Sequence, residues 1–136
     1  MDGKTDSGVQ IGAGSFFVRL SRRNEPSADN GSSLAEIEVK AGPFTGLVAD
    51  DVLFGVAEFC SDLQSLYDRL TGRATLRSYE KFELMAEGNG RGAIHGLVEL
   101  YGCHDPLSKL TFELDVDQTF LPDLIRSLRK EFLEPH

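Results

Sequence analysis

The sequence predicts an α+β fold, in which a mostly antiparallel sheet of about seven strands carries two amphipathic helices on one face. Apolar and polar residues alternate with a period of two in seven segments, whereas in two others apolar residues recur every three or four positions. The connections between successive alternating segments are short, which favours antiparallel pairing of neighbours. Because each helix has a single apolar stripe, the two helices together can cover one face of the sheet and leave the other open.

The alternating segments are interpreted as strands from the sides to which their apolar residues point. In the first of them, Val18 and Leu20 lie on one side and Phe17 and Arg19 on the other. The seven segments are residues 15–21, 34–40, 44–49, 73–79, 81–87, 93–101 and 109–115. An Asn-Gly pair within residues 88–92 predicts a hairpin, because both turn positions tolerate positive φ.

Two segments have the spacing of helices. The first runs over residues 52–70, where Asp50 or Asp51 is available to cap the start. The second runs from about residue 119 to residue 133. Asp117-Gln118-Thr119 joins the last strand to this helix, so we expect a structural role in which side-chain oxygens cap free N–H groups and Gln118 bridges backbone groups.

Length and composition predict one domain over residues 1–136, with residues 1–13 as a flexible N-terminal segment. The formal charge is −8 at pH 7, from 22 acidic and 14 basic residues. This charge disfavours binding to nucleic acid or to an anionic membrane, and it favours a basic partner. No signal peptide or membrane-spanning run is visible and the two cysteines form no disulfide framework, so the cytoplasm is the expected compartment.

No residue pattern points to catalysis, a metal or a cofactor. Cys103-His104-Asp105 contains candidate ligands, but adjacent residues of a turn point in different directions, and a polar turn explains the tripeptide better. Cys60 lies on the apolar stripe of the first helix, where packing is its expected role. The sequence therefore predicts a chain that is not an enzyme. A hydrolase or small-ligand binder stays an alternative, which would need a concave pocket with converging polar groups.

The sheet face opposite the helices is the most informative feature. Large apolar and aromatic side chains are expected there among carboxylates, as in a binding surface whose anchors lie inside a charged rim. The candidate partner-binding residues are Phe17, Glu36, Glu38, Tyr79, Met85, Leu97, Glu99, Tyr101, Glu113 and Asp115. The alternative is that loops, a curled sheet or a second copy of the chain covers this face, and in the last case the chain would form a homodimer.

Several stretches resemble the WapI-type family of bacterial immunity proteins. The matching stretches are residues 42–46, 59–63 with 66, 67 and 70, 72–76, 90–92, 110–114 and 117–125. The last two are the most distinctive, and the similarity covers about residues 34–133. The resemblance implies a bacterial cytosolic protein that binds and neutralises a cognate toxin, often a nuclease, and it implies no catalytic residue. Toxin neutralisation is the leading hypothesis, and the alternative is a structural or regulatory domain that self-associates through the open sheet face.

Overall fold

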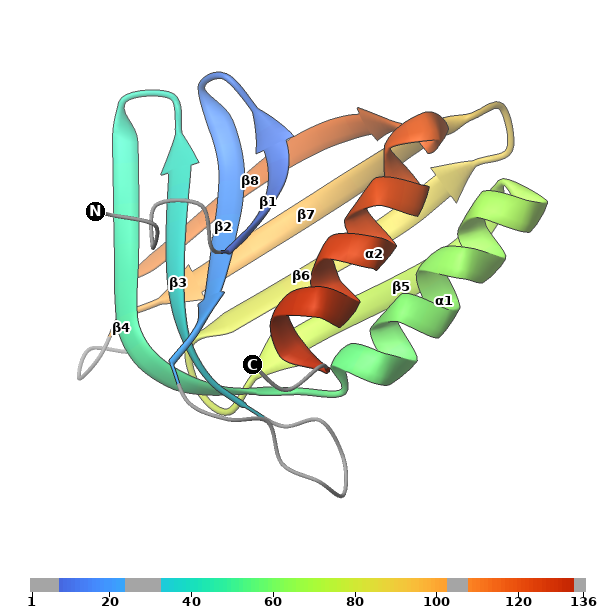
Figure 1. The fold of residues 1–136 in the computed structure, drawn as a ribbon. Helices are drawn as coiled ribbons and strands as arrows, with labels where there is room; N and C mark the ends of the chain where they lie inside the picture. Colours follow the sequence, from blue (N-terminus) through green and yellow to red (C-terminus); the bar gives the residue numbers. More distant parts are fainter. Residues whose placement is uncertain (1–7, 24–32, 103–107, 134–136) are drawn as a thin grey trace.

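The computed structural model describes residues 8–23, 33–102 and 108–133, which form one sheet, two α-helices and a short 3-10 helix (Figure 1). The elements are β1 (Val9–Ala13), β2 (Phe16–Arg22), β3 (Ser33–Ala41), β4 (Phe44–Phe54), α1 (Val56–Arg69), β5 (Thr71–Ser78), β6 (Phe82–Asn89), β7 (Ala93–Tyr101), β8 (Lys109–Asp117), η2 (Gln118–Phe120) and α2 (Leu121–Phe132). The strands lie in the sheet in their chain order, and every neighbouring pair is antiparallel. The predicted α+β class is confirmed, with eight strands in place of about seven.

The additional strand is β1, which lies in the segment that the sequence predicts to be flexible. Val9 and Ile11 are buried and pair with Leu20 and Val18 of β2. Two inward-pointing residues are too few to produce a clear period of two, and the glycine-rich surroundings hide them further. The expectation of flexibility is therefore corrected for residues 9–13, whereas residues 1–7 lie outside the described part of the chain.

The sheet curls until its first half lies against its last strands (Figure 1). The ring centroid of Phe16 on β2 lies 6.3 Å from that of Phe112 on β8. On β4, a Cβ added to Gly46 would lie only 2.5 Å from Leu100 Cδ2 of β7. The helices cover the rest of the inner face, since α1 packs beside β5 and α2, while α2 packs beside β1 and β2. The two predicted helices on one face are present, and the sheet itself supplies the remaining cover.

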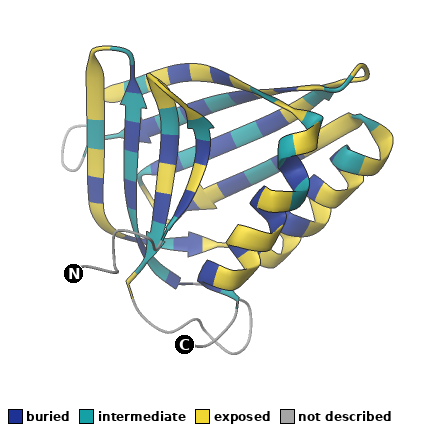
Figure 2. Ribbon diagram, turned by 45° about the horizontal axis from the view of Figure 1, so that its top comes forward, coloured by how far each residue is buried: buried dark blue, intermediate teal, exposed yellow. Residues whose placement is uncertain are grey.

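Burial alternates along the strands as the period of two predicts (Figure 2). The inward residues of all eight strands and the apolar stripes of both helices form one core. Phe59 of α1 and Phe132 of α2 are the largest side chains that are fully buried in it, and Cys60 is buried beside them as predicted. Since full burial of a Leu or Phe side chain contributes about 1.5–3 kcal/mol, this core supplies most of the stabilisation of the fold.

The first helix begins later than the sequence predicts. β4 continues to Phe54, and α1 begins at Val56 after Gly55, which has a φ of 68°. Residues 52–54 stay in the strand because they pair with β3 on one side and with β5 on the other. The predicted capping role of Asp50 or Asp51 is therefore wrong, because tertiary pairing overrides the helical spacing of the segment. Asp51 instead has a buried structural role within β4.

The segment Asp117-Gln118-Thr119 joins β8 to α2 and, through Gln118, also bonds to the β6–β7 turn and to α1, in agreement with the expected structural role. The amide N–H of Gln118 donates to the carbonyl of Gly92 at 2.7 Å, and its side-chain Nε2 reaches the carbonyl of Tyr67 at 3.5 Å. The hydroxyl of Thr119 donates to Asp117 Oδ2 at 2.6 Å. The side chain of Asp117 does not cap η2, so the structural role is confirmed through bridging by Gln118 rather than through a capping hydrogen bond.

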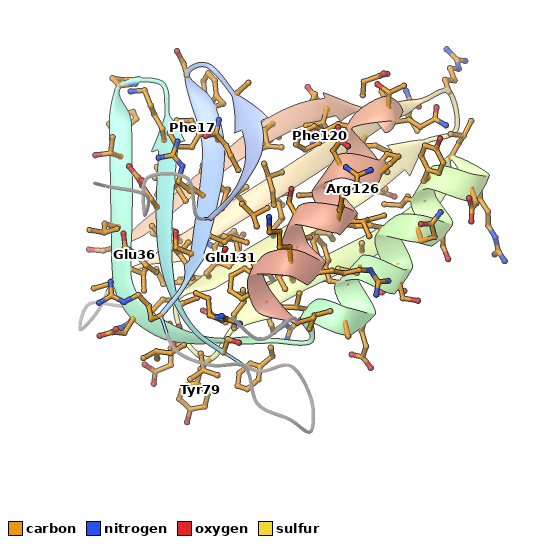
Figure 3. The ribbon with its side chains drawn as sticks, in the orientation of Figure 1. Phe17, Glu36, Tyr79, Phe120, Arg126 and Glu131 are labelled. Atoms are coloured by element: carbon orange, nitrogen blue, oxygen red, sulfur yellow. The ribbon has the colours of Figure 1, made fainter. Side chains whose placement is uncertain are left out.

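A buried carboxylate near the end of α2 accepts hydrogen bonds from the residue that precedes β1 and from the last residue of β2 (Figure 3). Glu131 is only 8% exposed, and its two oxygens accept hydrogen bonds from the amides of Gly8 at 3.2 Å and Arg22 at 2.8 Å. Glu131→Gln keeps one acceptor and should lower the free energy of unfolding by about 1 kcal/mol, whereas Glu131→Ala leaves both amides unsatisfied and should cost about 3 kcal/mol. Urea denaturation checks both values, with the exposed neighbour Lys130→Gln as the control; equal losses for all three variants would contradict this role.

Candidate protein-binding site

The outer face of β5–β8 brings together six of the ten predicted binding residues. The register places Met85 of β6 opposite Leu97 of β7, and Leu97 opposite Glu113 of β8. The rows on either side of this pair consist mostly of charged residues, namely Arg77, Glu83, Glu99 and Thr111 on one side and Arg73, Glu87, His95 and Asp115 on the other. Met85 and Leu97, which are both half-buried, thus lie between two rows of mostly charged side chains on the same sheet face.

Carboxylates outnumber fixed cations on this outer face. The acidic residues are Glu83, Glu87, Glu99, Glu113, Asp115 and Asp117, and the basic residues are Arg73, Arg77 and Lys109. Each cation approaches one carboxylate, with nitrogen–oxygen distances of 3.7 Å for Arg73–Glu87, 3.5 Å for Arg77–Glu83 and 3.8 Å for Lys109–Glu99. The remaining carboxylates give the face an excess of negative charge, and these exposed pairs orient side chains more than they stabilise the fold.

Two side chains other than the three cations hold carboxylates of this face in place. The hydroxyl of Tyr101 donates to Glu99 Oε1 at 2.7 Å. His95 lies between two acids, with Nδ1 2.9 Å from Asp115 Oδ1 and Nε2 3.4 Å from Glu113 Oε1. The hydrogen bond to Asp115 raises the pKa of His95, and the negative charges of Asp115 and Glu113 raise it further. His95 therefore becomes protonated at a higher pH than an isolated histidine, and its positive charge then offsets part of the negative charge of this face.

Three of the predicted residues lie on the other half of the curled sheet. Phe17 and Glu36 project from the outer side of β2 and β3, away from the outer face of β5–β8 (Figure 3). Glu38 lies two residues after Glu36 in β3 and therefore on the same side. Their environment is not acidic, because Arg19 lies 3.6 Å from Glu38 and 5.3 Å from the centre of the Phe17 ring, and Arg23 lies 2.8 Å from Glu36. The curl therefore divides the single face that the sequence predicts into two surfaces of different charge.

Tyr79, the last of the predicted residues, lies at the turn between β5 and β6 (Figure 3). Its side chain is 68% exposed, and its ring packs edge-on against Phe54 of β4 with a centroid distance of 6.3 Å. Phe54 was not among the predicted binding residues, because the spacing of its segment predicts a helix there. The exposed Phe44 and Leu47 of β4 were not among the predicted binding residues either.

The described residues contain no group that resembles a metal centre or an activated nucleophile. No three His, Cys, Asp or Glu side chains among them converge to hold a metal ion. Burial raises the pKa of Cys60, and the positive charge of Arg129 offsets only part of this effect, so the thiol stays protonated and inaccessible. Cys103-His104-Asp105 lies outside the described residues.

Comparison with known proteins identifies a family. The model of the immunity protein WapI-like family matches residues 10–134, which is nearly the whole chain. No curated protein and no solved structure matches the chain. Among the described residues, neither helix is long and apolar enough to cross a membrane.

Proposed function

Because this chain belongs to the WapI-like immunity protein family, we propose that it binds a cognate bacterial toxin and neutralises it by covering the toxin's functional surface. The family gives the chain an immunity-type role, which in general is non-catalytic and directed at a toxin. The proposed contact surface is the outer face of β5–β8. The proposed compartment is the bacterial cytoplasm, where a toxin that enters a neighbouring cell would act.

The observation that carries the choice of surface is the Met85–Leu97 pair inside a rim of carboxylates. Apolar side chains at the centre of an interface supply most of the binding energy, because they are fully desolvated when the partner docks. Charged residues around them exclude water and select the partner. Met85 and Leu97 have this central position, and Glu83, Glu87 and Glu99 surround them in the paired strands.

The excess of carboxylates favours a basic partner. A nuclease is a suitable example, because any protein that binds nucleic acid needs lysines and arginines to neutralise phosphates. An acidic surface that covers those cations would exclude the substrate and would accelerate association through long-range attraction. Glu99, Glu113 and Asp115 extend this acidic surface over β7 and β8.

Neutralising these three carboxylates should slow association with the toxin. The triple variant Glu99→Gln, Glu113→Gln and Asp115→Asn should lower the association rate constant about tenfold at low salt, and the difference should shrink as salt screens the charges. The probe is the C-terminal domain of the large secreted protein that we expect to be encoded beside this chain. Stopped-flow kinetics or surface plasmon resonance at several salt concentrations measures the rate.

A variant with the same change in charge elsewhere provides the control. Glu58→Gln, Asp62→Asn and Asp68→Asn remove three exposed carboxylates from α1, so a rate loss equal to that of the first variant would indicate a general effect of net charge. An unchanged rate for the first variant at low salt would exclude the outer face of β5–β8. If the chain alone is a dimer in light scattering and Leu97→Glu makes it monomeric, this face serves self-association instead.

A further inference from the structure

Two carboxylates on the outer face of β5–β8 have a histidine as their partner in place of a fixed cation. The arginines and the lysine of this face each approach a glutamate of β6 or β7. Within the described part of the chain, no lysine or arginine pairs with Glu113 or Asp115 of β8. His95 of β7 lies beside both, with Nε2 3.4 Å from Glu113 Oε1 and Nδ1 2.9 Å from Asp115 Oδ1. The charge of one imidazole ring therefore determines whether these two carboxylates are compensated.

The protonation state of His95 changes how many of these carboxylates it can bind. A neutral imidazole has one N–H group and donates to one acceptor, whereas an imidazolium has two N–H groups and can donate to both. The side chains of His95, Glu113 and Asp115 are 49%, 66% and 74% exposed. A docking protein can therefore reach all three, and a cation that it brings competes for the carboxylates only when the ring is protonated.

Acidic groups face His95 from both neighbouring strands. Glu87 of β6 and Asp115 of β8 lie directly opposite it, and Asp117 follows Asp115 on the same side of β8. The fixed cation of this row is Arg73 of β5, which lies 3.7 Å from Glu87. Both helices pack against the inner face of the sheet. The hydrogen bond to Asp115 and the surrounding negative charges raise the pKa of His95 above its ordinary value of about 6.5.

A basic partner should lower this pKa again. A lysine or arginine placed beside Glu113 and Asp115 repels an imidazolium and competes with it for the two carboxylates. Fewer protons are then bound in the complex than in the free chain, so binding releases protons. By linkage, the affinity is highest where His95 is neutral and falls as the pH decreases through the pKa of His95 in the free chain. Each unit by which the partner lowers this pKa corresponds to a tenfold loss of affinity at low pH.

We propose that His95 makes toxin binding depend on pH, because its neutral form leaves the negative charge of Glu113 and Asp115 available to a lysine or arginine of the toxin, whereas its protonated form engages both carboxylates. His95 lies inside the proposed contact surface, since it precedes Leu97 by two residues on the same side of β7. The chain then binds a basic toxin tightly at neutral pH and more weakly on acidification. This inference rests on the proposed toxin-binding function and adds regulation of the same surface.

Two substitutions that fix the charge at position 95 test this inference. His95→Gln is neutral at every pH. Between about pH 8 and about pH 5.5, the wild-type affinity for the toxin domain should fall about tenfold more than the affinity of this variant. His95→Lys is charged throughout, so its affinity at about pH 8 should already be about tenfold below that of the wild type. Isothermal titration calorimetry gives the affinities, and thermal unfolding verifies that the variants are folded at both pH values.

Matched variants separate His95 from other sources of pH dependence. The double variant His104→Gln and His136→Gln removes the other two histidines of the chain and should keep the wild-type pH dependence. Ser65→Lys on the exposed side of α1 adds a lysine at a distance and should bind the toxin domain as the wild type does. Calorimetry in buffers of different ionisation enthalpy counts the protons released on binding, and the wild type should release more of them at about pH 7 than His95→Gln.

The outcomes separate this inference from the proposed function. A weaker pH dependence in His95→Gln, together with a low affinity of His95→Lys, supports regulation by His95. Equal pH dependence in the wild type and His95→Gln overturns it, whereas toxin binding through the outer face stands if the triple carboxylate variant slows association. A wild-type affinity that rises on acidification relative to His95→Gln also overturns it. A wild-type chain that does not bind the toxin domain at any pH overturns both proposals.

Discussion

Replacing Gly88 by alanine should lower the free energy of unfolding by about 3 kcal/mol, at the upper end of the usual cost of overpacking. A Cβ on Gly88 of β6 would lie 2.4 Å from the carbonyl oxygen of Leu70 and 2.9 Å from its carbonyl carbon. Two features hold the backbone of Leu70 in place. It ends α1 with a φ of 65°, and its carbonyl accepts a hydrogen bond from the amide of Gly90 at 2.8 Å. The clash must therefore displace the end of the helix or the β6–β7 hairpin.

Gly96→Ala is the matched control for this prediction. Gly96 is another glycine of the sheet without a positive φ, but its added Cβ would meet the end of the flexible Leu114 side chain at 3.0 Å rather than backbone. We expect a loss of at most about 1 kcal/mol for this variant. Urea denaturation monitored by circular dichroism measures both losses. A smaller loss for Gly88→Ala than for Gly96→Ala would show that the end of α1 can move freely.

The role of Gly88 also shows what the sequence could not predict. The Asn-Gly pair correctly predicted the β6–β7 hairpin, in which Asn89 Oδ1 accepts hydrogen bonds from the amides of Arg91 and Ala93. Hairpin geometry is local, so the residues of the turn specify it. The contact between Gly88 and Leu70 joins a strand to the end of a helix that lies earlier in the chain. Such packing is visible only in three dimensions.

The same distinction between local and long-range contacts explains which of the predicted binding residues lie on one face of the sheet. Met85, Leu97 and Glu113 lie opposite one another on three successive strands, because short connections fix the register of antiparallel neighbours. The alternation of apolar and polar residues then determines to which face of the sheet each side chain points. Phe17 and Glu38 alternate in the same way, but their position relative to these three residues depends on the curl of the whole sheet. The curl brings residues of distant strands together, such as the partly exposed Phe16 and the buried Phe112, and a period of two contains no information about such contacts.

Removal of the Asp51 carboxylate should lower the free energy of unfolding as much as Gly88→Ala does. Asp51 is buried in β4, and its Oδ2 accepts hydrogen bonds from the Ser78 hydroxyl at 2.6 Å and from the amides of Glu80 and Lys81 at 3.0 Å each, while Oδ1 accepts from the amide of Val52 at 3.0 Å. Asp51→Ala should lower the free energy of unfolding by about 3 kcal/mol, because the buried Ser78 hydroxyl and the turn amides lose their acceptor. Asp51→Asn should cost about 1–2 kcal/mol, since the amide keeps one oxygen acceptor.

The stabilisation by Asp51 should depend on pH with a definite sign. Burial alone would raise the pKa of Asp51, but the hydrogen bonds from Ser78 and from the amides of Glu80, Val52 and Lys81 outweigh burial and hold the pKa below its ordinary value. A carboxyl group with a lowered pKa in the folded state binds fewer protons there than in the unfolded chain. Its contribution is therefore complete above the unfolded pKa of about 4 and is lost as the pH falls through the lower, folded pKa.

The difference in stability between the wild type and Asp51→Asn should consequently stay constant from pH 7 to about pH 5 and narrow below about pH 4. Urea denaturation over this range measures the difference directly. Asp50→Asn changes the exposed neighbouring carboxyl group and serves as the control for the general loss of one negative charge. A difference that widens on acidification, or one that Asp50→Asn reproduces, would mean that the ionised carboxylate of Asp51 does not hold the turn between β5 and β6. In that case the pairing of β4 with β5 at residues 53–54, rather than this carboxylate, would have to fix the point where the two halves of the sheet meet.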